Sequence, residues 1–232
     1  MPATEQLTQA ERDKQEIDPD IDFREIATRP FDELSPNLIG MFKWSGVYHQ
    51  LQKGFFMIRL RVPGGVLTAP QLRRAGELCK EYAQDQLGIT TRQCLQFHWV
   101  RQQDIYKVIE GMRAVGVLTT NACGDVCRNV VGCPGQGTCP HEIGDTGAML
   151  RRVADDPELL QQQRNLPRKH KINIVGCGRA CGMELMNCQG FHPVVRKTST
   201  GTEERGWEFL AGGGLGQLPH MGQRIFEWVP ED

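Results

Sequence analysis

Residues 120–139 read TNACGDVCRNVVGCPGQGTC, and this glycine-rich stretch contains four of the nine cysteines of the chain. A second short segment, GCGRACG at residues 176–182, contains two more. Two cysteines of the first segment have five residues between them, and the two of the second have three. Four thiolates supplied by two loops are the ligand set of a [4Fe–4S] cluster. The spacing therefore predicts a cluster whose ligands are Cys133, Cys139, Cys177 and Cys181.

Other uses of these cysteines stay open at this point. A structural zinc site also takes four thiolates, although its cysteine pairs usually lie closer together in the sequence. Disulfides rank last, because nothing marks the chain as secreted. Cys127 and Cys133 also have five residues between them, so Cys127 is an alternative first ligand.

Length and composition are those of an ordinary globular protein. The chain has 232 residues, 39% of them hydrophobic and 24% charged, and its net charge is −1. This charge gives no field that would recruit nucleic acid or an anionic membrane. No apolar stretch approaches the length of a membrane span, and no secretion signal is visible at the N-terminus. We therefore expect a cytoplasmic protein with reduced or metal-bound cysteines.

The first half of the chain follows a strand–helix–strand–helix pattern. Apolar residues alternate along residues 56–62, as in a strand, and a helix predicted over 70–83 follows and ends by Gly88. The next strand is predicted over 91–100 and the next helix over 104–115. This order of elements predicts an α+β fold with a ferredoxin-like N-terminal half domain.

The ends of the chain receive two further predictions. Residues 1–40 are polar and predict a flexible arm with at most a short helix. Residues 221–229 predict an amphipathic helix. Between them we expect a half domain over 41–118 and a cofactor-binding α+β domain over 119–232.

Four basic residues stand beside the cysteine motifs rather than on an obvious solvent face. Converging guanidinium and ammonium groups bind small oxyanions. The alternative is that the RKHK segment is a solvated basic edge. Cys79, His98 and His141 are interpreted as structural residues, although either histidine is a possible metal or haem ligand. The candidate oxyanion ligands are Arg92, Arg128, Lys169 and Lys171.

Five segments, in order, resemble the siroheme-dependent nitrite and sulfite reductase family. The resemblance extends from about Phe42 to the end of the chain. The segments are FKWSGVYHQLQKGFFMIRLRVPGG, TTRQCLQFHWV, TNACGDVCRNVVGCP, NLPRKHKINIVG and WEFLAGGGLG.

The resemblance implies siroheme coupled to a [4Fe–4S] cluster and the six-electron reduction of sulfite to sulfide or nitrite to ammonia. It implies that Cys181 bridges the cluster and the siroheme iron. CPGQGTCP resembles the cluster loop of the family, which favours Cys133 with Cys139 over Cys127. The TTRQ, RN and RKxK motifs imply substrate and cofactor binding by Thr91, Arg92, Gln93, Arg128, Asn129, Lys169 and Lys171.

Most members of the family contain two such modules, whereas this chain has one. It is therefore interpreted as a small complete reductase or as a remnant of a longer one. A lone module predicts a homodimer, and the lack of a flavin or nicotinamide motif predicts a separate donor such as ferredoxin. The competing functions are a non-catalytic electron-transfer or accessory subunit and a zinc-stabilised interaction module.

Overall fold

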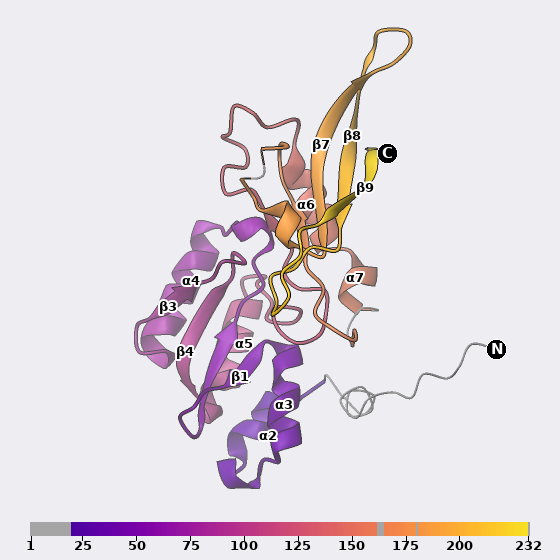
Figure 1. The fold of residues 1–232 in the computed structure, drawn as a ribbon. Helices are drawn as coiled ribbons and strands as arrows, with labels where there is room; N and C mark the ends of the chain where they lie inside the picture. The colour runs from indigo at the N-terminus through magenta and orange to yellow at the C-terminus, as the bar shows by residue number, and fades with distance from the viewer. Residues whose placement is uncertain (1–19, 162–164, 180, 232) are drawn as a thin grey trace, which may run out of the picture.

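The computed structural model describes residues 20–161, 165–179 and 181–231. It contains helices and two separate sheets, which confirms the predicted α+β class. In Figure 1 the indigo-to-magenta first part lies below the orange and yellow second part, and the sheets belong to different parts. Among the described residues no helix is long and apolar enough to cross a membrane.

The first part is a four-stranded antiparallel sheet with strand order β1-β2-β4-β3. Helices α4 and α5 pack against each other and against this sheet, around a core that includes Phe56, Phe97 and Val108. The strands are β1 (Val47–His49), β2 (Phe55–Arg59), β3 (Leu87–Ile89) and β4 (Leu95–Arg101), and the helices are α2 (Phe23–Thr28), α3 (Pro36–Met41), α4 (Ala69–Tyr82) and α5 (Ile105–Arg113).

Helix α4 begins where the sequence predicts and ends earlier. Thr68 caps it, since its hydroxyl accepts from the Gln71 backbone N–H at 3.4 Å and the Gln71 side chain accepts from the Thr68 N–H at 2.9 Å. The predicted stop at Gly88 is wrong: the helix ends at Tyr82, and Gly88 lies within β3. Cys79 is 3% exposed in the core, as predicted.

The prediction of a flexible arm over residues 1–40 is wrong from residue 20 onward, and residues 1–19 lie outside the described residues. Asp22 caps α2 by accepting from the Arg24 backbone N–H at 2.8 Å. Phe23 and Ile26 lie one helical turn apart and are buried against the first core. The polar average of the segment concealed this short apolar stripe.

The second part is a five-stranded mixed sheet with strand order β5-β6-β7-β8-β9. Its first three strands run parallel, and the last two pairs are antiparallel. Helix α6 contributes Leu150 and Ala154 to a core that also contains Ile174 and Trp207. The strands are β5 (Val131–Gly132), β6 (Ile172–Ile174), β7 (Gln189–Lys197), β8 (Glu203–Ala211) and β9 (Gln223–Pro230), and the helices are α6 (Thr146–Ala154) and α7 (Pro157–Gln161).

The prediction of a C-terminal helix over residues 221–229 is wrong, because this segment forms β9. The segment is rich in aromatic and β-branched residues, which favour strands. Phe226 stacks on Phe209 of β8 with ring centroids 6.2 Å apart, and Phe209 stacks on Phe191 of β7 at 4.9 Å. The cross-strand aromatic contacts outweigh the helical periodicity of the sequence.

The two parts are joined by polar contacts as well as by packing. The Arg61 guanidinium is 7% exposed, donates to the Ala154 carbonyl at the end of α6, and lies 3.5 Å from the Asp155 carboxylate. The Gln93 side-chain amide donates to the Gly132 carbonyl at 3.0 Å and accepts from its N–H at 2.9 Å. These contacts hold the 90–94 loop of the first part against β5 of the second.

Candidate functional site

The four predicted cluster ligands lie on two loops at one edge of the second sheet. Cys133 and Cys139 follow β5, and Cys177 and Cys181 follow β6. Because β5 and β6 are parallel neighbours, their carboxyl ends and the loops that follow lie side by side. A side chain at Gly135 would lie 3.6 Å from the Cys139 Cβ and 3.9 Å from the Cys133 Sγ. Because Gly135 has no side chain, both cysteines of the first loop can lie close to it.

The thiols of these four residues act on one another. Burial raises the pKa of Cys133, and the neighbouring thiols of Cys177, Cys139 and Cys181 raise it further. Among the described residues no group of three His, Cys, Asp or Glu side chains is arranged to bind a single metal ion. Ligands of a four-iron cluster each bind a different iron and need not converge on one point. Four thiolates on two neighbouring loops are the ligand set that a four-iron cluster needs.

Cys127, the alternative first ligand, lies elsewhere. It is 5% exposed and packs in the second core beside Val130 and Leu150. Burial raises its pKa to about 11, and the charged groups that act on it are Arg61, Arg92 and Cys188 rather than the other cluster cysteines. Its surroundings are those of a core residue.

Arg92 reaches from the first part into the second. Its guanidinium donates to the Asn187 Oδ1 at 2.8 Å and to the Asn129 carbonyl at 2.7 Å. Asn129 holds the same loop from the other side, since its side-chain nitrogen donates to the Arg92 carbonyl at 2.9 Å and to the Val62 carbonyl at 2.8 Å. Desolvation lowers the pKa of Arg92, and the nearby charge of Arg128 lowers it further.

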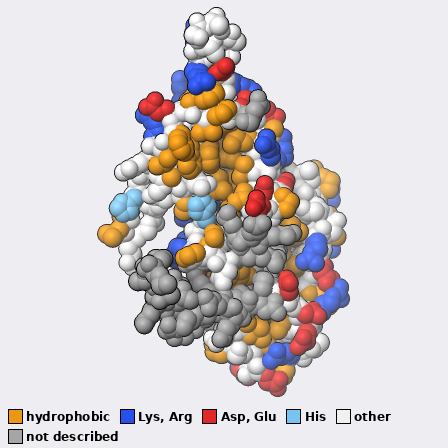
Figure 2. All heavy atoms as spheres, turned by 90° about the vertical axis from the view of Figure 1, so that its right-hand side faces the viewer, with side chains coloured by type: hydrophobic (Ala, Val, Ile, Leu, Met, Phe, Trp, Pro, Cys, Tyr) orange, Lys and Arg blue, Asp and Glu red, His pale blue; other side chains and the backbone are white. Residues whose placement is uncertain are grey.

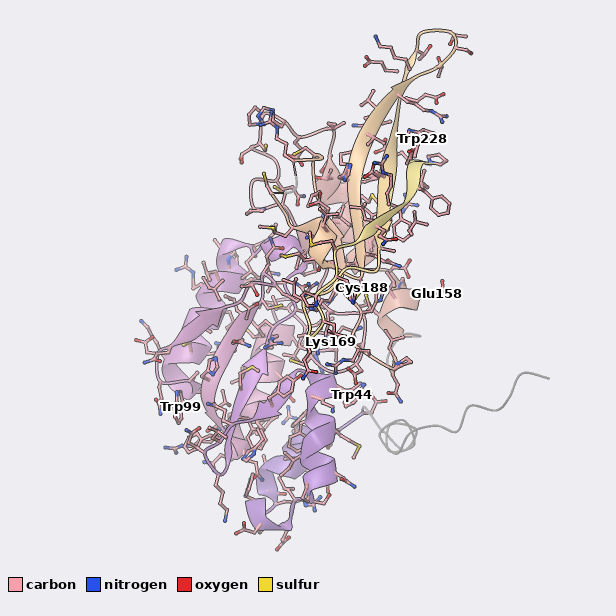
Figure 3. The ribbon with its side chains drawn as sticks, in the orientation of Figure 1. Trp44, Trp99, Glu158, Lys169, Cys188 and Trp228 are labelled. Carbon is pink, nitrogen blue, oxygen red and sulfur yellow. The ribbon has the colours of Figure 1, made fainter. Side chains whose placement is uncertain are left out.

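The other predicted cations gather in the same region. The Arg128 guanidinium donates to the Gly124 carbonyl at 2.6 Å, which fixes it beside the cysteine-rich loop. Burial lowers the pKa of Lys169, and the positive charges of Lys171, Arg128 and Arg168 lower it further. Figure 3 shows Lys169 near the middle of the molecule, where the two parts meet. Arg128 therefore lies close enough to act on both Arg92 and Lys169, and Lys171 acts on Lys169.

Two cavities open beside these residues. The larger, about 500 Å³, has Arg92 and Lys171 in its wall together with the predicted ligand Cys181. The smaller, about 130 Å³, is lined by Arg92, Arg128 and Asn129. Arg92 thus lies between the two, whereas Lys169 lines neither. The larger cavity is also lined by Thr91, Gln93, Asn173, Met183, Met186, Asn187 and Leu215.

Arg59 of β2 is a candidate that the sequence analysis missed. It lines the smaller cavity with Arg92 and Arg128. The Gln96 amide oxygen, oriented toward the guanidinium, accepts from the Arg59 Nε at 2.9 Å and from Nη2 at 2.5 Å. The sequence did contain a signal for Arg59: a charged residue follows the buried positions of β2 directly. Its partner Gln96 could not be identified without the sheet register.

Three buried polar atoms around the cavities have no hydrogen-bond partner: Arg92 Nε, Asn129 Oδ1 and Asn173 Oδ1. An unpaired buried polar group costs about 1–3 kcal/mol, so such atoms are typical of a site that is completed by a ligand. Arg92 and Asn173 line the larger cavity together with the apolar residues Met186 and Leu215, and Asn129 lines the smaller one. The cationic and polar lining fits the peripheral carboxylates of siroheme, and Met186 and Leu215 offer apolar contacts to the face of its macrocycle.

Comparison with protein-family models identifies both parts of the chain. The model described as the nitrite/sulfite reductase ferredoxin-like half domain matches residues 48–115. The model described as the nitrite and sulphite reductase 4Fe-4S domain matches residues 123–232.

Similar curated proteins are considerably longer than this chain. An assimilatory ferredoxin-dependent nitrite reductase of Haloferax mediterranei is 34% identical over 82% of this chain and 35% of its own length. A sulfite reductase [ferredoxin] of Mycolicibacterium paratuberculosis is 31% identical over 89% of this chain and 39% of its own length. The chain therefore spans less than half the length of these relatives.

Two solved structures have folds similar to that of this chain. The NirA protein of Mycobacterium tuberculosis matches 94% of this chain and 43% of its own, with 30% identity and a TM-score of 0.78. A dissimilatory sulfite reductase matches 77% of this chain with 13% identity and a TM-score of 0.64, which is a likeness of fold alone.

Proposed function

The chain belongs to the nitrite and sulfite reductase family, and we propose that it is a reductase that uses siroheme and a [4Fe–4S] cluster to reduce sulfite or nitrite with six electrons. One observation carries the proposal. A cavity of about 500 Å³ is lined by Arg92 and Lys171 together with the predicted cluster ligand Cys181. An electron carrier without turnover has no need of cations beside its cluster.

The cofactors would be held by residues of both parts. Cys133, Cys139, Cys177 and Cys181 would bind the cluster, and the position of Cys181 in the cavity wall supports the role of bridge to siroheme. Thr91, Arg92, Gln93, Arg128 and Asn129 line the two cavities and would bind cofactor carboxylates or substrate. When bound, the cluster and siroheme would relay electrons from the donor and provide the iron at which the anion is reduced.

The chain itself supplies charge and protons. The guanidinium groups of Arg59, Arg92 and Arg128 stay charged and would bind the oxygen atoms of the anion. Lys169 and Lys171 can also give protons away. Because burial and neighbouring cations lower the pKa of Lys169, its Nζ is a better acid than that of an exposed lysine. Each oxygen that leaves as water needs two protons. Lys171, which lines the larger cavity, would deliver them, and Lys169 would supply protons from beside it.

Partners and location are proposals of the same kind. Relatives are named for ferredoxin, which supports ferredoxin as the electron donor. A homodimer is supported by exposed apolar side chains on the strands of the second sheet, namely Val195, Ile225 and Phe226. Figure 2 shows that apolar side chains gather on the upper part of one face of the molecule. We also propose a cytoplasmic location and a domain division at residues 41–118 and 119–232.

The test is anaerobic purification of the full chain from a host that makes siroheme. Iron, acid-labile sulfide and extracted siroheme are measured, and turnover of sulfite and nitrite is followed with a reduced dye as donor. Siroheme with four cluster irons and turnover of either anion is the expected result. A cluster without siroheme or turnover would leave the accessory subunit as the function, and a colourless zinc protein would contradict both.

A further inference from the structure

A histidine that is 13% exposed lies between two carboxylates beside the second cysteine loop. His192 of β7 has its Nδ1 3.8 Å from the Glu184 Oε1 and its Nε2 3.5 Å from the Glu208 Oε1. The side chains of His192, Glu184 and Glu208 are 13%, 3% and 17% exposed. Three ionisable groups are thus withdrawn from solvent in one row, and none of them lines either cavity described above.

The row is incomplete at its buried end. His192 Nδ1 and Glu184 Oε2 are both buried and have no hydrogen-bond partner. At the other end Glu208 is paired, because its Oε2 lies 3.4 Å from the Nε of Arg224 on β9. A buried carboxylate without a partner is costly unless a positive charge faces it or it takes a proton. Uptake of a single proton between Glu184 and His192 would relieve this cost, so the pair is prepared to accept one.

The row touches the loop that carries two of the predicted cluster ligands. A side chain at Gly178, which follows Cys177 directly, would lie 3.4 Å from the His192 Nε2. Glu184 begins the short 3-10 helix η5 (Glu184–Met186), three residues after Cys181. The other charged side chain of this loop is Arg179, which is exposed to solvent. Glu142 also faces this loop at Gly176, but its two oxygens already accept from the Gly137 N–H and the Thr146 hydroxyl. The imidazole of His192, whose Nδ1 has no hydrogen-bond partner, is therefore better placed to respond to the charge on this loop.

We propose that the Glu184–His192 pair takes up one proton when the cluster takes up one electron. This rests on the proposed function, because it assumes the cluster on Cys177 and Cys181. With His192 protonated, the charges of Glu184, Glu208, His192 and Arg224 sum to zero, and without that proton they sum to −1. An electron added to the cluster places a further negative charge beside the row and favours the protonated form.

The step balances in charge and atoms. The donor, a ferredoxin-type protein, loses one electron and the cluster gains it. One proton from solvent binds the imidazole, on the nitrogen that faces Glu184, and no covalent bond breaks. The reduction of sulfite or nitrite consumes protons and electrons together, so a proton stored with each electron remains near the site of use.

The test is potentiometric and does not depend on turnover. The midpoint potential of the cluster is measured by EPR on the reconstituted full chain between about pH 6 and 9, the range in which histidine usually exchanges its proton. For a one-electron couple linked to one proton, the potential falls by at most about 59 mV per pH unit. We expect such a slope over part of the range in the unchanged protein and its loss in His192→Gln.

Two further variants make the result decisive. His98→Gln replaces a histidine of β4 whose imidazole faces Gly88 in the first part, so it should keep the slope. Glu208→Gln removes one carboxylate that favours the protonated imidazole and should move the sloping region to lower pH. This variant also serves if His192→Gln fails to bind a cluster.

Three results would overturn the inference: a potential independent of pH in the unchanged protein, a slope that His192→Gln leaves intact, or a slope that Glu208→Gln does not shift. In all three cases the bound cluster and the proposed reductase function would stand. A chain that binds no iron and sulfide on reconstitution would overturn both.

Discussion

Replacing Arg92 by methionine should weaken the contact between the two parts and lower the free energy of unfolding. The guanidinium makes two bonds across the junction, at 2.8 Å to the Asn187 side chain and 2.7 Å to the Asn129 carbonyl. A hydrogen bond from a charged donor contributes about 1.5–3 kcal/mol. Part of this is offset, because burial of the guanidinium is itself unfavourable, as its lowered pKa shows. We expect a net loss of about 3 kcal/mol in the free energy of unfolding.

The assay is thermal unfolding of the cofactor-free full chain by circular dichroism. For a chain of this size about 3 kcal/mol corresponds to a fall in Tm of about 6–12 °C. Arg101→Met is the matched control, because Arg101 lies at the end of β4 with an exposed side chain. It should change Tm by less than about 2 °C. Equal Tm values for the two variants would refute the idea that Arg92 ties the parts together.

Four other substitutions test the site and the assembly. Lys171→Met should lower turnover of sulfite and nitrite at least tenfold, about 1.4 kcal/mol, with the cofactor spectrum intact, and loss of the cofactor instead would contradict a substrate-binding role. Cys139→Ser should abolish the cluster absorption while Cys127→Ser retains it, and the reverse result would reassign the first ligand. Because the pKa of Lys169 is lowered below 10.5, kcat/KM should fall with rising pH earlier than an ordinary lysine allows, and Lys169→Arg, which stays charged, should remove that limb. Phe226→Glu should convert a dimer to a monomer in light scattering, since this side chain is 56% exposed on the apolar sheet face, and an unchanged mass would exclude that face as the contact.

The parts of the fold that the sequence predicts are those with local causes. Helix α4 is readable because Thr68 and Gln71 cap it within four residues. Strand β9 is not readable in the same way, because it is stabilised by pairing with β8, and its own residue pattern does not reveal that partner. The segment from residue 20 to 41 was misinterpreted since its average polarity hides the buried Phe23 and Ile26.

The site divides in the same way. The cysteine spacing and the basic motifs each lie within a short stretch of sequence, so the candidate site residues could be predicted without coordinates. Their convergence could not, because it depends on the parallel pairing of β5 with β6 and on the 90–94 loop reaching Asn129. Arg59 was missed because Gln96, which orients it, becomes its neighbour only when β2 pairs with β4. The roles assigned to all of these residues stay predictions.

The two hydrogen bonds between the Gln93 side chain and the Gly132 backbone affect the solubility of the second part. Strand β5 lies at the border of the second sheet, and an open border invites pairing with a strand of another molecule. Here the Gln93 amide takes up both backbone groups of Gly132, and the Gly64 N–H donates to the Val130 carbonyl at 3.0 Å. The first part thereby pairs with the edge strand β5, as a sixth strand of the sheet would, and covers this edge. Residues 119–232 produced alone would leave these groups open and should self-associate, whatever their cofactor content.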